Sequence, residues 1–200
     1  VSRRQVEVRN GAVANGPRIA VMDFGAKENI LRELCSRASE VAVFPSRATA
    51  DEVRAWNPDG IMLSNGPGDP EAVVGATETV RALLGWKPIF GICMGHQILS
   101  RALGAKTFKL KFGHRGGNHP VKDQLLGKIY VTSQNHGYAV DDKTLPSDVR
   151  VTHTNLNDGT VEGVECSSKL CFSVQYHPES HPGPHEAVQL FDYFIERLRK

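Results

Sequence analysis

Cys93 is the residue whose neighbours best suit it to act as a nucleophile. It lies in Gly91-Ile-Cys-Met-Gly95, after a short apolar run at 89–92 and before apolar residues at helical spacing from 96 to 103. The flanking glycines permit the sharp strand-to-helix turn of a nucleophile elbow, with cysteine in place of serine. A helix N-terminus favours a thiolate, and its N–H groups can stabilise an oxyanion. The alternative is a small buried cysteine without chemistry.

A base for this cysteine is present in Val174-Gln-Tyr-His-Pro-Glu179. His177 follows an apolar run, and Pro178 fixes a turn that carries Glu179. A cysteine nucleophile needs a base that also returns a proton to the leaving group, and a carboxylate can fix the tautomer of that base. The alternative is that His177 lies in an exposed turn and has no catalytic role. The chain has eight histidines, so one of them can follow a strand by chance. Pairing Cys93 with His177 and Glu179 is the sharper hypothesis, because both segments follow predicted strands.

Three polar, glycine-bearing stretches are candidates for the walls of a site. Ser64-Asn-Gly-Pro-Gly-Asp-Pro70 is stiffened by prolines, and Gly66 and Gly68 leave its N–H groups uncovered, so it could place a donor against a carbonyl oxygen. It lacks the Gly-Lys-Ser/Thr of a phosphate loop, and an ordinary tight turn is the alternative. The stretches 111–119 and 134–138 are interpreted as loops that could line a pocket.

The remaining histidines and cysteines predict no metal site. His177, His181 and His185 are spaced as on one helix face, but prolines at 178, 182 and 184 exclude a continuous helix there. The cysteines show no C-x-x-C spacing. We interpret Cys35, Cys166 and Cys171 as structural, reduced thiols, which are typical of a cytoplasmic protein.

Strand and helix patterns alternate through the first half of the predicted domain. Apolar runs predict strands at 18–22, 41–44, 60–63 and 88–92, and helical spacing predicts helices at 29–38, 49–56, 76–84 and 96–103. Shorter strands at 128–132, 149–152 and 171–175 follow, and then a helix from about 184 to 198. This order predicts an α/β fold: an open, mostly parallel twisted sheet with flanking helices plus a mixed or antiparallel C-terminal part. Functional loops then gather at the carboxyl ends of the strands.

Length and composition predict one domain. The 200 residues carry a net charge of +2, which gives no electrostatic reason to expect nucleic acid. We expect no membrane partner, because no apolar run approaches the roughly 20 residues of a membrane span, and the N-terminal residues lack a signal-peptide core. We interpret 1–17 as a linker or arm from a missing N-terminal domain and 18–200 as the functional domain.

The motifs together resemble class I (triad-type) glutamine amidotransferases. Gly91-Ile-Cys-Met-Gly-His-Gln97 and Tyr176-His-Pro-Glu179 look like the catalytic pair of that family. The stretches 111–120 (Lys-Phe-Gly-His-Arg-Gly-Gly-Asn-His-Pro) and 23–31 (Asp-Phe-Gly-Ala-Lys-Glu-Asn-Ile-Leu) are similar to the small, glutaminase portion of carbamoyl-phosphate synthetase. The resemblance runs from about residue 18 to 198.

The resemblance implies a Cys-His-Glu triad of Cys93, His177 and Glu179. Cys93 would attack the side-chain amide of L-glutamine, and water would release glutamate from the thioester after ammonia has left. The matching loops imply an oxyanion hole formed by the N–H groups of Gly66 and Met94. Substrate-binding residues would be Gly66, Gly68, Met94, Gln97, Asn135, Gly137 and Tyr138.

The resemblance also implies partners. Ammonia would pass to a carbamoyl-phosphate synthetase large subunit, or to fused synthetase domains, for pyrimidine or arginine biosynthesis. No cofactor is expected in this domain, because ATP and Mg²⁺ would be used by the synthetase. The family's N-terminal small-subunit domain, which contributes a serine near the glutamine, is absent from these residues, so the isolated piece would bind glutamine less well. Met94 stands where leucine is commoner, but its implied role uses only the backbone.

Three other functions are alternatives. The first is a glutaminase of another synthetase, such as those that make anthranilate or GMP, against which the 111–120 stretch argues. The second is a non-catalytic glutamine-binding domain on the same fold, against which the intact Cys93, His177 and Glu179 argue. The third is a cysteine peptidase on a related fold, which no feature of the sequence supports.

Overall fold

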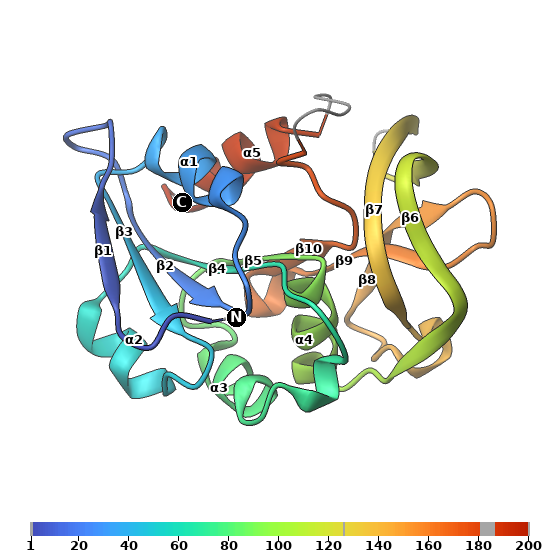
Figure 1. Ribbon diagram of the computed structural model, residues 1–200, viewed down its shortest axis with the longest axis horizontal. Helices are drawn as coiled ribbons and strands as arrows, with labels where there is room; N and C mark the ends of the chain where they lie inside the picture. The colour runs from blue at the N-terminus through green and yellow to red at the C-terminus, as the bar shows by residue number, and fades with distance from the viewer. Residues whose placement is uncertain (1, 126, 181–186, 200) are drawn as a thin grey trace.

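One continuous sheet runs through the domain and carries every candidate site residue at or near its strands. The structure is a computed structural model that describes residues 2–125, 127–180 and 187–199. Within these residues ten strands are joined in the order β1-β3-β2-β4-β5-β10-β9-β8-β6-β7 (Figure 1). The predicted fold class, an open and mostly parallel sheet followed by a mixed C-terminal part, is confirmed.

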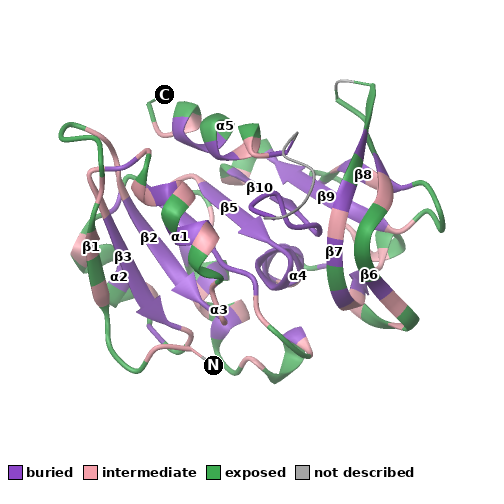
Figure 2. Ribbon diagram, turned by 45° about the horizontal axis from the view of Figure 1, so that its top comes forward, coloured by how far each residue is buried: buried purple, intermediate pink, exposed green. Residues whose placement is uncertain are grey.

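The centre of the sheet is parallel. It consists of β3 (Glu40–Pro45), β2 (Arg18–Asp23), β4 (Gly60–Leu63), β5 (Ile89–Ile92) and β10 (Cys171–Val174). These strands are buried on both faces, which explains why they are nearly continuous apolar runs in the sequence (Figure 2). Their carboxyl ends lie at one edge of the sheet, so the turns after β2, β4 and β5 are brought together there.

Helices cover both faces of the parallel part (Figure 1). On one face, α1 (Glu28–Cys35) and α5 (Gln189–Arg197) pack in one apolar cluster with the sheet. On the other face, α2 (Ala50–Trp56), α3 (Ala76–Leu83) and α4 (Met94–Leu103) pack in a second cluster. Three short 3₁₀ segments lie in connections: η1 (Pro70–Ala72), η2 (Asp142–Thr144) and η3 (Ser167–Lys169).

The second part of the sheet is antiparallel and contains β9 (Val161–Cys166), β8 (Arg150–Asn155), β6 (Thr107–Asp123) and β7 (Lys128–Val140). The expectation that 111–119 and 134–138 are loops is wrong, because both lie inside the long β6–β7 pair. Gly113 and Gly116 have φ of 71° and 109°, and the register shifts beside them. Such irregularities let a glycine-rich, polar stretch remain in a strand.

The N-terminal segment also differs from its expectation. The sequence predicts a linker or arm over residues 1–17, but β1 (Glu7–Asn10) pairs antiparallel with β3 at the edge of the sheet. Arg3 reaches the end of β2, where its backbone N–H and its guanidinium donate to Asp23 Oδ2 at 2.8 and 3.1 Å. The segment therefore packs on the domain, and its origin in a further N-terminal domain stays a prediction.

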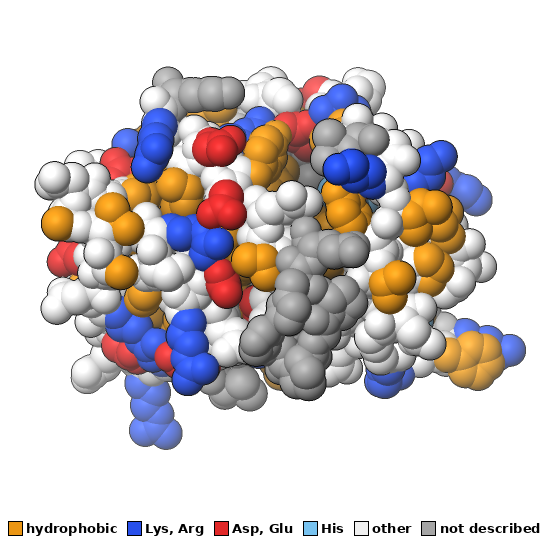
Figure 3. All heavy atoms as spheres, turned by 90° about the horizontal axis from the view of Figure 1, so that it is seen from above, with side chains coloured by type: hydrophobic (Ala, Val, Ile, Leu, Met, Phe, Trp, Pro, Cys, Tyr) orange, Lys and Arg blue, Asp and Glu red, His pale blue; other side chains and the backbone are white. Residues whose placement is uncertain are grey.

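Most element boundaries agree with the sequence to within a few residues. The last helix begins at Gln189 rather than near 184, and positions 184–186, with His181 and His185, lie outside the described residues. All four cysteines are free thiols, as expected. Among the described residues, none of the helices is both long and apolar enough to span a membrane. Over the face that carries α1 and α5, acidic, basic and apolar side chains are interspersed (Figure 3).

Candidate active site

Cys93 occupies a strained turn between β5 and α4. Its φ of 53° and ψ of −102° are unusual for a non-glycine residue, as expected of a nucleophile elbow. The neighbouring glycines are required by close packing: a Cβ on Gly95 would lie 2.1 Å from Leu63 O, and one on Gly91 would lie 2.7 Å from Gly95 O. The turn is held from the adjacent strand, because Cys93 N–H donates to Val174 O at 2.9 Å.

His177 and Glu179 form the predicted pair directly beyond β10. Glu179 Oε1 lies 2.8 Å from His177 Nδ1, and both side chains are buried. Since a carboxylate only accepts, Nδ1 carries the hydrogen and Nε2 is left for Cys93. Burial opposes a charge on His177, but hydrogen bonds to Cys93 and Glu179 outweigh it and raise the pKa of His177 to about 9. The three residues therefore form a contiguous Cys-His-Glu arrangement.

A cavity of about 280 Å³ opens over Cys93. Seven of the residues expected from the sequence line it: Gly66, Gly68, Cys93, Gln97, Asn135, Gly137 and His177. Its volume lies just below the range of pockets for drug-sized ligands, roughly 300–1,000 Å³, so it suits a molecule of amino-acid size. Met94 is the first residue of α4, and its N–H therefore belongs to the turn that has no intrahelical acceptors.

Gln97 and the strand β7 are tied together at the cavity wall. Gln97 Nε2 donates to Tyr138 O at 2.9 Å and to Gln175 Oε1 at 3.0 Å. Gln97 Oε1 is buried and has no hydrogen-bond partner among the described residues. An acceptor is thus left available at a cavity wall. Tyr138, Met94 and Glu179 are not among the described residues that line the cavity: Tyr138 contacts Gln97 through its backbone oxygen, and Glu179 stands behind His177.

Sequence reasoning missed four polar residues that line the same cavity: Lys27, Asn65, Arg115 and His136. Each lies in a stretch with a recognisable motif, but not at a position that the motif itself marks as functional. Asn65 Oδ1 accepts from Lys27 N–H at 2.9 Å, which joins the turn after β2 to the turn after β4. The position of both turns at the carboxyl edge of the parallel strands was the available signal.

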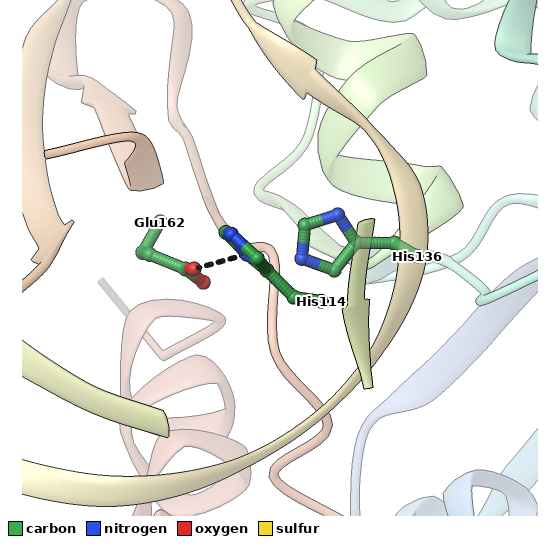
Figure 4. A group of neighbouring side chains, drawn as sticks. All are labelled: His114, His136 and Glu162. Atoms are coloured by element: carbon green, nitrogen blue, oxygen red, sulfur yellow. Dashed lines mark ion pairs between the residues drawn. The ribbon is translucent and has the colours of Figure 1, made fainter. Parts of the chain in front are cut away.

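His114, His136 and Glu162 form a buried cluster that extends inward from the cavity wall, where His136 lies (Figure 4). His114 Nε2 lies 2.8 Å from Asp158 Oδ2, and its Nδ1 lies 3.5 Å from Glu162 Oε1. The Glu162 and Asp158 carboxylates raise the pKa of His114 against the effect of burial, whereas burial lowers the pKa of His136 to about 4. Two histidines and a carboxylate are suitable metal ligands, but Gln134 Oε1 occupies the position next to His136 Nε2 at 2.9 Å. We interpret the cluster as a hydrogen-bonded network.

A larger cavity, of about 490 Å³, lies between α5 and the strands β8 to β10. Aromatic side chains, including Phe172, Tyr176 and Tyr193, and several carboxylates line it, and no cysteine is among its described lining residues. The chemistry of a nucleophile with a base is therefore located in the smaller cavity.

Comparison with known proteins agrees with this geometry. The family described as glutamine amidotransferase class-I matches residues 20–197. A carbamoyl phosphate synthase small chain of Akkermansia muciniphila is 59% identical over 180 residues, which are 90% of this chain and 48% of that protein. A pyrimidine-specific small chain of Lactiplantibacillus plantarum is 54% identical over 92% of this chain and 51% of its own length. The chain thus spans about half the length of these curated relatives.

A solved structure shares the fold at low sequence identity. A protein of Thermoplasma acidophilum, described as one of the subunits of a GMP synthase, aligns with a TM-score of 0.79 and 22% identity, over 91% of this chain and 94% of that one. The likeness concerns the arrangement of sheet and helices alone. From the family match over residues 20–197, this chain belongs to the class-I glutamine amidotransferases.

Proposed function

We propose that this domain hydrolyses L-glutamine to glutamate and ammonia through a thioester on Cys93, and that the ammonia serves carbamoyl phosphate synthesis. The observation that carries the proposal is the position of Cys93, which lies on a strained elbow beside the His177–Glu179 pair and lines a cavity of amino-acid size. The small-chain relatives at 54–59% identity support carbamoyl phosphate as the product over anthranilate or GMP.

The chemistry follows from the roles of the three residues. His177 holds the proton of the Cys93 thiol, and the resulting thiolate attacks the side-chain amide carbon of glutamine. The negative charge that develops on oxygen is stabilised by the N–H groups of Met94 and Gly66. His177 then protonates the amide nitrogen, so the C–N bond breaks and ammonia leaves. Next, His177 takes a proton from water, which attacks the thioester and releases glutamate and the Cys93 thiolate. Glu179 holds the imidazole tautomer in both steps.

Glutamine binding is assigned to the cavity wall formed by α4, β7 and the turn after β4. Gln97 Oε1 and the backbone at Asn135 and Gly137 supply polar groups, and Gly68, where a Cβ would meet no heavy atom within 4 Å, leaves the main chain open to substrate. Gly66 is required by packing, because a Cβ there would lie 2.3 Å from Phe24 O. We expect L-glutamine as the ligand of this domain, with no cofactor here, and ATP with Mg²⁺ bound only by the synthetase partner.

The partner is inferred from the relatives. Proteins named as a small chain imply a larger synthetase chain, so we expect the ammonia to pass to a synthetase subunit or to fused synthetase domains. About half of each relative lies outside the matched region, and that half is a candidate to complete the glutamine site. The free thiols support a reducing compartment such as the cytoplasm.

The test is a nitrogen-source experiment on the native assembly with its synthetase. With glutamine as the nitrogen source, the wild-type protein should release glutamate and form carbamoyl phosphate, and Cys93→Ser should do neither. With ammonium chloride instead, both proteins should form carbamoyl phosphate at equal rates, because ammonia bypasses Cys93. Equal glutamine-dependent activity in both proteins would overturn the catalytic assignment. Glutamate release without carbamoyl phosphate would overturn the choice of synthetase.

A further inference from the structure

Glu162 is a fully buried carboxylate that the proposed reaction does not use. Its Oε2 accepts from Gln134 Nε2 in β7 at 2.9 Å, and its Oε1 accepts from Asn155 Nδ2 in β8 at 2.8 Å. His114 Nδ1, in β6, lies 3.5 Å from Oε1 (Figure 4). One side chain of β9 therefore joins the three other strands of the antiparallel part. Burial of a carboxylate costs free energy that such partners only offset, so a gain in stability does not explain it.

His114 balances the charge of Glu162. Its ring lies between two carboxylates, because Nε2 is 2.8 Å from Asp158 Oδ2 while Nδ1 faces Glu162. Two further rings face it, those of His119 and His136, with centroids 5.2 and 4.8 Å away. Glu162 and Asp158 raise the pKa of His114, so the imidazolium is favoured. With this cation beside it and an amide donating to each oxygen, Glu162 is a carboxylate, which only accepts hydrogen bonds.

The charge of Glu162 fixes the direction in which the Gln134 amide points. The NH₂ end of Gln134 donates to Glu162 and, at 3.0 Å, to Thr132 Oγ1. The reverse orientation would place the amide oxygen against the carboxylate. Gln134 Oε1 therefore faces His136 Nε2 at 2.9 Å, and because an amide oxygen only accepts, Nε2 carries the hydrogen. Burial lowers the pKa of His136 to about 4, so near neutral pH its Nδ1 has no hydrogen.

This pattern of hydrogens reaches the cavity wall. His136 lines the cavity, and its Nδ1 lies 2.8 Å from Tyr138 O. Without a hydrogen on Nδ1 this contact opposes two acceptors, and Tyr138 O is left to accept from Gln97 Nε2 at 2.9 Å. The opposed contact costs free energy, so the ring keeps its tautomer only while Glu162 holds the Gln134 amide in place.

We propose that Glu162 is a positioning residue of the glutamine site, whose charge acts through Gln134 and His136 on the wall that holds Gln97. The inference rests on the proposed glutaminase function and extends its binding site. Glu162 is not among the described residues that line the cavity, so it acts through others. Its backbone is tied to the same region, because Glu162 O accepts from Gln175 N–H at 2.8 Å.

Removal of the charge should release the chain of hydrogen bonds. In Glu162→Gln the amide of Gln134 can turn over, because position 162 then offers both a donor and an acceptor. The hydrogen of His136 can move to Nδ1 and be donated to Tyr138 O, where it competes with Gln97. Gln97 is then less well held for substrate. No step of the reaction uses this chain, so the effect should fall on KM for glutamine and spare kcat.

The experiment compares Glu162→Gln with Glu165→Gln in the native assembly, by steady-state kinetics of glutamate release. Glu165 is the matched control: it is another buried carboxylate of β9, but it pairs with Arg150 and Arg197 instead of the cavity wall. In Glu162→Gln, KM for glutamine should rise about tenfold, with kcat within about twofold of the wild type. Glu165→Gln should have the wild-type KM.

A second variant, Gln134→Met, breaks the same chain at its next link and keeps the side-chain volume. Its KM should rise by a similar factor, which keeps the inference testable if Glu162→Gln fails to fold. The double variant should have a KM no higher than that of Gln134→Met, because residues that act through one chain are not additive. If the two increases multiply instead, Glu162 does not act through Gln134 and the inference is overturned.

The outcomes separate this inference from the proposed function. If the wild-type protein releases no more glutamate than Cys93→Ser, the glutaminase proposal fails. If the wild type is active and Glu162→Gln has the same KM as Glu165→Gln, only the role of Glu162 is overturned. A fall in kcat with KM unchanged would also overturn it, since Glu162 would then influence the reaction instead of the binding of glutamine.

Discussion

His177 is attached through its backbone to the strand that forms the wall of the cavity: its N–H donates to Ser133 O in β7 at 3.0 Å. The same strand places Asn135 and Gly137 at the cavity and gives Tyr138 O to Gln97. The base and the substrate wall therefore share one rigid element. This connection explains how a histidine after β10, in the parallel part, is aligned with the wall of the cavity that the antiparallel strands β6 and β7 supply.

Replacement of Glu179 tests the orientation of His177. Glu179→Gln removes the negative charge opposite Nδ1 but keeps the side-chain size. The pKa of His177, now raised to about 9, should fall, and the imidazole tautomer should no longer be fixed. We expect glutamate release to drop about 10²- to 10³-fold, which is less than for a serine nucleophile because cysteine ionises more readily. Steady-state kinetics near neutral pH measures the effect.

A control is needed because Glu179 is fully buried. The urea midpoint of Glu179→Gln should remain close to that of the wild type, and synthesis from ammonium chloride should be unchanged. Unchanged glutamine hydrolysis in a folded variant would contradict the triad and leave Glu179 a structural role.

Gln97 offers a test of substrate binding that is separate from chemistry. Gln97→Met keeps the side-chain volume but removes the donor to Tyr138 O and Gln175 Oε1 and the free acceptor Oε1. Because no proton transfer is assigned to Gln97, KM for glutamine should rise about 10- to 100-fold with a smaller change in kcat. A loss confined to kcat would contradict its assignment to binding.

The elbow and the triad were predictable because their signals are local. The signals for the elbow are contiguous in the sequence: an apolar run, then Gly91 and Gly95, then apolar residues at helical spacing. The resulting strand, turn and helix position Cys93 with few contacts from distant residues. His177 and Glu179 are two residues apart and follow an apolar strand in the same way. Long-range contacts then bring the two segments together through the parallel pairing of β5 with β10, which the local spacing does not predict.

The errors occur where distant partners decide the structure. The stretch 111–119 contains turn-forming residues, but its pairing with β7 overrides that local preference. β1 has only four residues, and its partners in β3 lie 30 to 36 positions further along the chain, so the sequence favoured a polar arm. Lys27 resembles a solvated lysine at a helix start, and its contacts with His177 and Glu179 cross about 150 positions.

Gly95 should be intolerant of any side chain. A Cβ there would lie 2.1 Å from Leu63 O, so Gly95→Ala must push α4 away from β4. We expect a loss of about 3 kcal/mol or more in the free energy of unfolding, measured by urea denaturation. Gly117→Ala is the matched control: a Cβ at Gly117 meets no heavy atom within 4 Å, so its stability should stay near that of the wild type. Equal stabilities would contradict the close packing of the elbow.

His96 should make the fold sensitive to mild acid. It is fully buried on α4, with Nδ1 2.8 Å from Ser173 Oγ and no partner for Nε2 among the described residues. Burial, aided by His136 and His153, lowers the pKa of His96 from 6.5 to about 3. In the unfolded chain His96 is therefore protonated below about pH 6.5, whereas in the folded protein it stays neutral down to about pH 3. The free energy of unfolding should fall by about 1.4 kcal/mol per pH unit across that range.

The comparison of wild type with His96→Gln isolates this contribution, because the carboxylates and other histidines titrate in both proteins. Urea denaturation at pH 7, 6, 5 and 4 should give a steeper decline for the wild type, by up to about 1.4 kcal/mol per pH unit. The glutamine amide can still reach Ser173, so a folded variant is expected at pH 7. If the free energies of unfolding of the two proteins declined in parallel, His96 would be protonated in the folded protein. That result would contradict its assignment as a buried, neutral histidine.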